Sequence, residues 1–540
     1  MAKSRTHSRS KTHPSHKPKS SPKMRKGAER ERVTRRLFFG WRGWCIRFGL
    51  AIVVPVLLLA FLEFGLFVLG FGHPAKLFVE TQRKETLTTN EWFAWFYHER
   101  RSTRPHPCLV SVVKPKDTIR VFVLGESAAM GTPDPSFGFG RILEVMLQRY
   151  FPNHRVQVVN AAMRGINSHI IVPISRECAK LAPDIFVVYM GNNEVVGLYG
   201  PETFLGRYPA LISVLHRVKQ TRVCQLVRIG IKGGLSAFQP KEETQTMEFF
   251  RRHRVALDDT RREAVYRNYR DNLVQICDNA LQSGACVLVL TAAVNLRDCP
   301  PLASLHRNGL TSQDLHRWES FYRDGIEQEN KQNPAEAVAH YLKAAAVDNH
   351  YAELHFRLGR CYLATGETKT AKDRFSLARD WDALQFRADS RLNEIAREVA
   401  AEYDGKKVQL VDAETALALS DQCRNGVPGS DLFYDHVHFR FDGDYELAKA
   451  VLPGAICVLK QNRGLVPSES AGIPSRSQCA KRLAFTAWDE VNTAAGMAKM
   501  TALPPFTDQL DHSLRQYRAE QAISQVMSRV DKKFVSEVVE

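Results

Sequence analysis

The sequence predicts an α/β protein built on a parallel, three-layer sheet, and two observations lead to this class. Five short apolar runs have the length and composition of buried strands: 119–124, 156–160, 185–190, 287–290 and 408–411. Helical patterns lie between them, at 140–150, 169–180, 266–281 and 392–403, the last two with apolar residues at i, i+3, i+4 and i+7. Strands that alternate with helices form a parallel sheet covered by helices on both faces.

The chain of 540 residues is too long for one ordinary domain, and its composition, 44% apolar and 25% charged, is that of a globular protein. Residues 1–47 hold fifteen Lys and Arg against Glu29 and Glu31, so they carry most of the formal charge of +17. This segment has almost nothing to bury and is predicted to be a disordered basic tail. The rest is nearly balanced in charge and has no basic-aromatic interleaving, which argues against nucleic-acid binding.

Residues 48–72 are predicted to form a transmembrane helix, because a long apolar run is interrupted only by Pro55 and Glu63. A cleaved signal peptide is the main alternative, but no A-x-A site follows the run. The basic tail then places the amino terminus in the cytoplasm and the body of this single-pass protein across the membrane. Residues 73–117 form a juxtamembrane segment whose aromatic cluster fits an interfacial belt or a packed lead-in.

Ser127 is the first candidate catalytic residue. It lies in the sequence Gly125-Glu126-Ser127, which ends the first strand run with a turn. Open α/β sheets bind ligands outside the carboxyl ends of their strands, so a hydroxyl on this turn is exposed to a substrate. The alternative is an ordinary βα turn that happens to contain serine.

Polar residues and glycine also follow three other strand runs. Gly165 follows the second run, Asn193 follows the third, and Asp435 and His438 follow the fifth. In a parallel sheet these loops meet at one edge, so Asp435 and His438 can reach Ser127.

Together and in this order, the residues resemble the block pattern of the SGNH hydrolases, the GDSL-type esterases. The resemblance covers the sheet-forming parts of residues 118–452 and implies a flavodoxin-like fold that hydrolyses acyl esters. It implies that Ser127 is the nucleophile and that Asp435 and His438 complete a catalytic triad. The family's oxyanion donors correspond to Ser127 and two further residues of this chain, Gly165 and Asn193.

The match has two departures, and both are acidic residues. Glu126 occupies the place where the family name implies Asp, and Glu194 ends the third block where Asp is usual. Neither change touches a predicted catalytic atom. The departures therefore affect the assignment to a subfamily more than the expected chemistry.

General chemistry supports the same roles. A serine hydroxyl needs a base within hydrogen-bond reach, and an imidazole suits that task at neutral pH. A carboxylate on the other ring nitrogen fixes the tautomer, and three donors can stabilise the oxyanion of the tetrahedral intermediate. His436 competes with His438 for the role of base, but its spacing from Asp435 does not fit the family pattern.

Two insertions interrupt the alternation of strands and helices. Residues 195–262 contain a basic-apolar run, 207–232, that fits either a membrane surface or a cover over the active site. Residues 312–386 contain two copies of a pattern 34 residues apart, which resembles the tetratricopeptide repeat and suggests a protein-binding surface. The paired positions are Tyr322 and Phe356, Gly325 and Gly359, Ala337 and Ala371, Tyr341 and Phe375, and Ala344 and Ala378.

The predicted hydrolase domain covers residues 118–464, including the repeat insertion. Residues 465–540 are read as a linker and a helical region, with packing positions but no candidate chemistry. The eleven cysteines are widely spaced and lack a CxxC pair, so no metal site, other cofactor or disulfide framework is expected. One or two disulfides in an extracytoplasmic body stay open.

These observations favour a membrane-anchored serine esterase that cleaves an acetyl or other short-chain ester, with acylated carbohydrates among the candidate substrates. One alternative keeps the same residues and transfers the acyl group to an exported polysaccharide. The other is a protein-interaction scaffold with a vestigial hydrolase fold, against which the complete set of Ser, Asn, Asp and His counts. The acyl group, the acceptor and any partner of the repeats stay open.

Overall fold

A five-stranded parallel sheet lies at the centre of the protein. The computed structural model describes residues 41–97, 103–197, 199–201, 209–235 and 254–530. The sheet has the order β5-β4-β6-β7-β8, and each neighbouring pair is parallel. Its strands are β4 (Thr118–Gly125), β5 (Arg155–Asn160), β6 (Ile185–Tyr189), β7 (Cys286–Leu290) and β8 (Val408–Val411). All five predicted strands are therefore present, each within one residue of its expected bounds.

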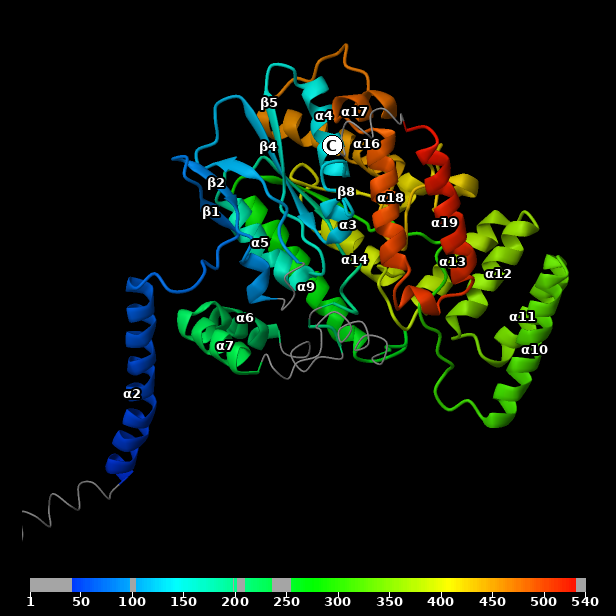
Figure 1. The fold of residues 1–540 in the computed structure, drawn as a ribbon, viewed down its shortest axis with the longest axis horizontal. Helices are drawn as coiled ribbons and strands as arrows, with labels where there is room; N and C mark the ends of the chain where they lie inside the picture. Colours follow the sequence, from blue (N-terminus) through cyan, green and yellow to red (C-terminus); the bar gives the residue numbers. More distant parts are fainter. Residues whose placement is uncertain (1–40, 98–102, 198, 202–208, 236–253, 531–540) are drawn as a thin grey trace, which may run out of the picture.

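Helices pack on both sides of this sheet (Figure 1). One layer contains α5 (Ser168–Ala179), α9 (Arg262–Gln282) and α14 (Ser390–Ala401), in which α9 packs on both of the other helices. The other contains α4 (Phe139–Tyr150) and α16 (Phe441–Arg463). Every residue of β4, β6 and β7 is buried, as expected for strands covered on both faces. The predicted class, α/β with a parallel sheet, is confirmed.

The strand register aligns the carboxyl ends at one edge. Gly125 pairs with Tyr189, Tyr189 with Leu290, and Leu290 with Val411. The loops that follow these four strands therefore leave the sheet side by side, where a ligand site is expected.

The juxtamembrane segment forms a small antiparallel sheet and a short helix. The strands are β1 (Phe78–Glu80), β2 (Thr86–Thr89) and β3 (Leu109–Ser111), and η1 spans Phe93–Phe96. Phe93, Phe96 and Tyr97 are buried in the main core. The aromatic cluster was expected either to form an interfacial belt or to pack on the body, and these three residues pack on the body.

The apolar amino-terminal run forms one long helix, α2 (Trp41–Val68). Within it, Trp44–Val68 is long and apolar enough to cross a membrane, and no other helix of the described residues meets that test. This helix begins before the predicted transmembrane segment, 48–72, and ends before that segment does. The helix stops at Val68 because the chain turns through Gly70, whose φ of +67° is easy only for glycine. The predicted tail lies outside the described residues up to residue 40.

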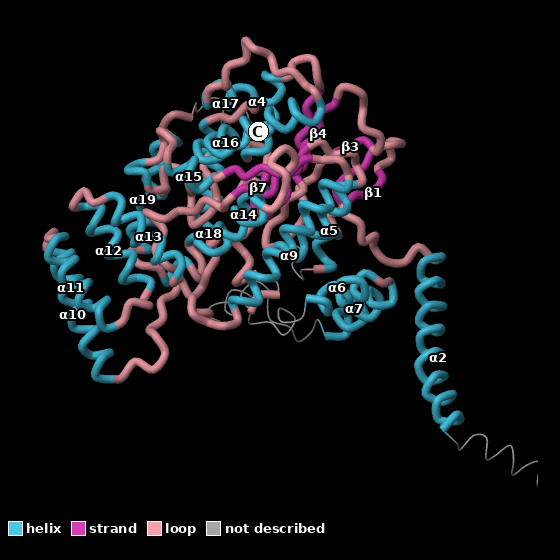
Figure 2. Tube along the Cα trace, turned by 180° about the vertical axis from the view of Figure 1, so that it is seen from behind, coloured by secondary structure: helices cyan, strands magenta, loops and turns pink. Residues whose placement is uncertain are grey.

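The basic-apolar run forms a helical hairpin of α6 (Pro209–Gln220) and α7 (Arg222–Leu235). Figures 1 and 2 both show it beside the body-proximal part of α2, and α2 packs on α7. The rest of the predicted insertion at 195–262 includes residues 198, 202–208 and 236–253, which lie outside the described residues.

The repeat insertion consists of two helical hairpins: α10 (Ser312–Asn330) with α11 (Pro334–Val347), and α12 (Ala352–Ala364) with α13 (Thr368–Asp380). The 34-residue period has a packing cause. A Cβ atom on Gly325 would lie 2.4 Å from the ring of Tyr341, and one on Gly359 would lie 2.8 Å from the ring of Phe375. In each repeat an aromatic ring therefore packs directly on a glycine of the partner helix.

The carboxyl-terminal region forms α17 (Arg476–Arg482), α18 (Ala487–Thr501), η4 (Phe506–Asp508) and α19 (His512–Met527). Of the four residues predicted to pack, Val491 and Met497 are buried, and Leu483 and Trp488 are half-buried. Figure 1 shows α18 and α19 between the sheet domain and the repeats. All eleven cysteines are unpaired.

Candidate active site

Ser127 begins the short helix α3 (Ser127–Met130), which follows β4 at once. The turn requires Gly125, because its φ is +155° and a Cβ atom there would lie 1.9 Å from the Tyr189 carbonyl oxygen. Ser127 itself is half-buried. The sequence therefore places a serine hydroxyl at the carboxyl edge of the sheet, on the first turn of a helix.

The structure brings Ser127, His438 and Asp435 into one hydrogen-bonded chain. The distance from Ser127 Oγ to His438 Nε2 is 2.9 Å, and the distance from His438 Nδ1 to Asp435 Oδ2 is 2.7 Å. The other carboxylate oxygen of Asp435 accepts from the backbone N–H groups of Val437 and His438. Because the carboxylate accepts at Nδ1, the Nε2 atom of His438 is left to accept from the serine hydroxyl.

The charge of Asp435 is maintained inside the protein. Burial alone would raise the pKa of Asp435, but the neighbouring His436 and His438 outweigh that effect and hold it well below its ordinary value. A carboxylate that stays ionised can orient and stabilise a protonated imidazole.

His436, the competing base, faces a different way. Its Nδ1 atom lies 3.1 Å from Asp435 Oδ2 but has no hydrogen-bond partner of acceptable geometry. Its ring packs against Phe506 and Phe386. His438 is therefore the histidine that the structure brings to Ser127.

The predicted oxyanion donors come from the ends of three adjacent strands, β5, β4 and β6. Gly165 is exposed in the loop after β5, with a φ of +67°. Asn193, in the loop after β6, donates from Nδ2 to the Ile166 carbonyl oxygen at 2.9 Å. An amide nitrogen carries two hydrogens, so Asn193 can link these loops and still offer a second hydrogen.

Glu126 and Glu194, the two departures from the family pattern, bind these loops together. Glu126 accepts from the backbone N–H groups of Asn192 and Asn193 at 2.8 and 3.2 Å. Glu194 accepts from the N–H and the hydroxyl of Ser168, each at 2.8 Å. Sequence reasoning missed this role, although an acidic residue in each of two strand-end loops was visible.

Both carboxyl groups are buried and have raised pKa values. Burial and the charge of Glu194 raise the pKa of Glu126 well above its ordinary value. Burial raises the pKa of Glu194 to about 7, despite its hydrogen bonds to Ser168. The pair therefore holds at least one proton at neutral pH, as expected when two close carboxyl groups share a dry site.

Asn295, after β7, supports the loop that carries the histidines. Its Nδ2 atom donates to the Asp435 carbonyl oxygen at 2.8 Å, and its N–H donates to the His436 carbonyl oxygen at 2.9 Å. Arg387 in turn donates to the carbonyl oxygens of Asn295 and Cys299. A single asparagine in a loop gave no sequence signal for this role.

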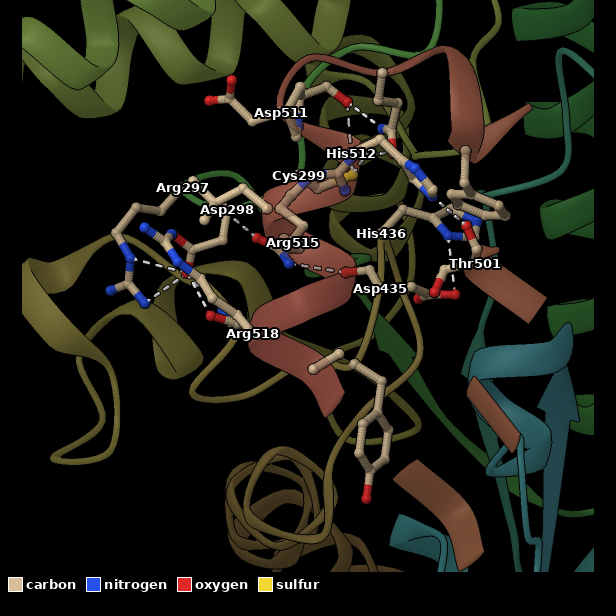
Figure 3. Close-up of a pocket in the computed structure, with 18 of the residues that line it drawn as sticks. Arg297, Asp298, Cys299, Asp435, His436, Thr501, Asp511, His512, Arg515 and Arg518 are labelled. Atoms are coloured by element: carbon tan, nitrogen blue, oxygen red, sulfur yellow. Dashed lines mark hydrogen bonds and ion pairs between the residues drawn. The ribbon is translucent and has the colours of Figure 1, made fainter. Parts of the chain in front are cut away.

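A cavity of about 600 Å³ lies behind the same loop (Figure 3). Asp435 and His436 line it, whereas Ser127 and His438 do not. Its other walls come from repeat helices α12 and α13, from the loop after β7 and from α19, which contributes His512, Arg515 and Arg518. The carboxyl-terminal region, in which the sequence showed no chemistry, therefore forms a wall of this cavity beside the site.

Asp435, His436 and His438 also place three ligand atoms within 4.8 Å of one another, the spacing of a metal site. No other group of this kind occurs among the residues that the structure describes. However, the 2.7 Å distance between His438 Nδ1 and Asp435 Oδ2 is that of a hydrogen bond, with no room for an ion between these two atoms. The geometry fits a catalytic histidine and its carboxylate better than a metal site.

Comparisons with known proteins identify only the insertion. The tetratricopeptide repeat family matches residues 331–390, which contain α11, α12 and α13. Comparison of the chain with curated proteins gave no match, and neither did comparison with solved structures. The repeat predicted from the 34-residue period is thus confirmed, while the hydrolase family and the catalytic roles stay predictions.

Proposed function

We propose that this protein is a membrane-anchored serine esterase of the SGNH hydrolase type. The observation that carries the proposal is the chain of hydrogen bonds from Ser127 through His438 to Asp435. The strand order adds support, since β5-β4-β6-β7-β8 is the order 2-1-3-4-5 of flavodoxin-like sheets.

In the proposed mechanism, Ser127 Oγ attacks the ester carbonyl while His438 Nε2 accepts its proton. Asp435 stabilises the imidazolium that forms. The tetrahedral oxyanion is stabilised by the amides of Ser127 and Gly165 and by the second hydrogen of Asn193 Nδ2. His438 then protonates the leaving alkoxide, and the acyl-enzyme is hydrolysed by water that the same histidine activates.

The anchor is the apolar segment of α2, with the basic tail in the cytoplasm and the catalytic body across the membrane. Protease added to spheroplasts should remove the body and leave a short protected fragment that contains Trp44–Val68. A fully protected body would contradict this topology.

The proposal can be tested by covalent labelling. A fluorophosphonate probe reacts only with an activated serine, so the full chain in detergent should be labelled at Ser127. The exposed Ser136, on the loop after α3, should remain unlabelled. Labelling at another residue, or no labelling of the folded protein, would contradict the proposed mechanism.

An acyltransferase would give the same labelling and differ in the fate of the acyl group. With an acetyl aryl ester as donor and a polysaccharide as added acceptor, the esterase releases acetate, whereas the transferase forms an acetylated polymer. The first outcome is expected.

The repeat match supports a second role, protein binding. Two exposed leucines on the repeats, Leu342 and Leu377, offer an apolar contact that the fold does not use. Changing both to aspartate should reduce chemical cross-linking to a partner in native membranes, while Leu419→Asp, which is outside the repeats, should not. Unchanged cross-linking would leave the repeats as a structural part of the enzyme.

A further inference from the structure

The hairpin of α6 and α7 is bonded to the candidate membrane span. The two carboxylate oxygens of Glu63, in α2, accept from the backbone N–H groups of Arg222 and Val223, each at 2.9 Å. These N–H groups begin α7 and have no partner within that helix. The guanidinium of Arg222 also lies over the ring of Phe67, at 4.7 Å. Glu63, the carboxylate that interrupts the apolar run of α2, therefore caps the amino-terminal end of α7 and connects the two helices.

These contacts fix the depth of the hairpin. Glu63 lies five residues before Val68, the end of the candidate span, which is roughly 7–8 Å along the helix axis. Just beyond the span, the N–H of His73 donates to Gln225 in the second turn of α7, at 2.8 Å. If α2 crosses a bilayer, α7 begins at the boundary between the lipid tails and the headgroups. In Figure 1 the hairpin lies across the axis of α2, so it runs along that boundary.

Both helices expose apolar side chains. On α6 the exposed residues follow helical spacing at positions 211, 214 and 218, and on α7 they are four of the six residues from 226 to 231. The side chains concerned are 38–55% exposed: Leu211, Val214, Val218, Leu226, Val227, Ile229 and Ile231. The neighbouring helix α2, which packs on α7, also exposes large apolar side chains along most of its length.

Other side chains of the hairpin contact the body of the protein. His216 and Gln225 are buried, and Tyr97 packs edge-on to the His216 ring at 4.7 Å. Arg228 donates to the Trp95 carbonyl oxygen at 2.6 Å and lies over the Trp95 ring. The body thus holds the hairpin through these residues, while the apolar side chains named above stay exposed.

The charge of the hairpin is also of one sign. Residues 209–235 contain no Asp or Glu, whereas Arg217 and Lys219 stand beside the apolar side chains of α6. Anionic headgroups attract such a flank, and apolar residues beside it enter the acyl boundary.

We propose that the hairpin of α6 and α7 is a second membrane-contact surface, seated in the headgroup region of the same bilayer that α2 spans. The inference rests on the proposed anchor and goes beyond it. With two contacts at an angle to each other, the body is held at a fixed orientation instead of swinging from a single helix. The neighbouring sheet edge then keeps a constant height above the lipid.

Lipid photo-crosslinking tests this directly. The full chain is placed in nanodiscs of phosphatidylcholine and phosphatidylserine that contain a phospholipid with a diazirine on its acyl chain. After illumination, labelled peptides are expected from Trp44–Val68 and from residues 209–231. The region around Leu419, which is 79% exposed on the body, serves as an internal control and should be unlabelled.

A paired substitution sharpens the test. Leu226→Asp with Val227→Asp should reduce labelling of the hairpin by at least about tenfold, since burial of one aliphatic side chain alone contributes about a factor of ten in binding. Labelling of α2 should persist, and Leu419→Asp should change neither signal. Both substituted residues are exposed, so folding should be retained, which a melting curve checks.

The outcomes separate this inference from the anchor itself. Labelled α2 with an unlabelled hairpin would overturn the second contact and leave the anchor. Neither segment labelled would overturn both. Hairpin-to-hairpin protein cross-links without lipid adducts would show that a second copy of the chain covers the surface, which would also overturn the proposal.

Discussion

The sheet edge around Ser127 and the repeat insertion are positioned by different kinds of contact. At the sheet edge, buried polar groups hold each loop through individual hydrogen bonds, such as those from Asn192 and Asn193 to Glu126. In the repeats, aromatic rings packed on Gly325 and Gly359 set the distance between helices. The first arrangement depends on single atoms and the second on shape, so substitutions should act on chemistry in one region and on stability in the other.

The two regions nevertheless meet at one cavity. Phe356 and Phe375 of the repeats line it together with Asp435 and His436. A ligand or partner on the repeats therefore has a direct route to the loop that carries His438.

The largest effect is expected from Ser127→Ala. Removing the nucleophile should lower kcat/KM toward a short aryl ester by at least about 10³-fold, because only binding and oxyanion contacts remain. Melting temperature should hardly change, since the hydroxyl makes no core contact. Ser136→Ala is the matched control with normal activity, and undiminished turnover by folded Ser127→Ala would contradict the proposed chemistry.

Asn193→Ala tests the oxyanion role. Loss of one donor should lower kcat by roughly 10²–10³-fold with a small change in KM. The bond to Ile166 is lost as well, so thermal stability is measured in parallel. A loss of kcat that merely follows the loss of folded protein would assign Asn193 to the support of its loop alone.

Glu194→Gln should change how stability depends on pH. The carboxyl titrates at 4.5 when unperturbed and at about 7 in the folded protein, so between these values only the folded form keeps the proton. The free energy of unfolding should therefore fall as pH rises from about 4.5 to about 7, by up to about 3 kcal/mol. Denaturant unfolding of Glu194→Gln should show a smaller fall in the free energy of unfolding over this pH range. The exposed control Glu398→Gln should show the same fall as the unsubstituted protein.

Gly359→Ala should give the smallest effect and confine it to the repeats. The added methyl would lie 2.8 Å from the Phe375 ring, and such overpacking costs about 1–3 kcal/mol. Hydrogen exchange should increase in α12 and α13, while activity toward a small ester is retained. Gly405→Ala, whose methyl meets no atom within 4 Å, is the control. Equal loss of ester activity would show that the two regions are not separable.

Local patterns in the sequence predicted most of the architecture. The five strands, the helices between them and the 34-residue repeat depend on composition and spacing within short windows, and the structure contains all of them. The end of α2 was misplaced because hydropathy continues to Phe71, whereas the chain leaves the helix at the Gly70 turn. Ser127, Asp435 and His438 were proposed from strand-end positions, which a parallel sheet brings to one edge.

Contacts between distant segments were decided only by the tertiary structure. Spacing favoured His438 over His436 as the base, but only the structure shows that the ring of His436 packs against Phe506, from the carboxyl-terminal region, while His438 contacts Ser127. The cap from Glu63 to α7 joins residues 159 positions apart, and no local pattern contains such a pair. Composition and periodicity determine which segments become strands, helices and repeats, because those preferences act between near neighbours. Which atoms then meet depends on how the packed layers close, and that is a property of the whole fold.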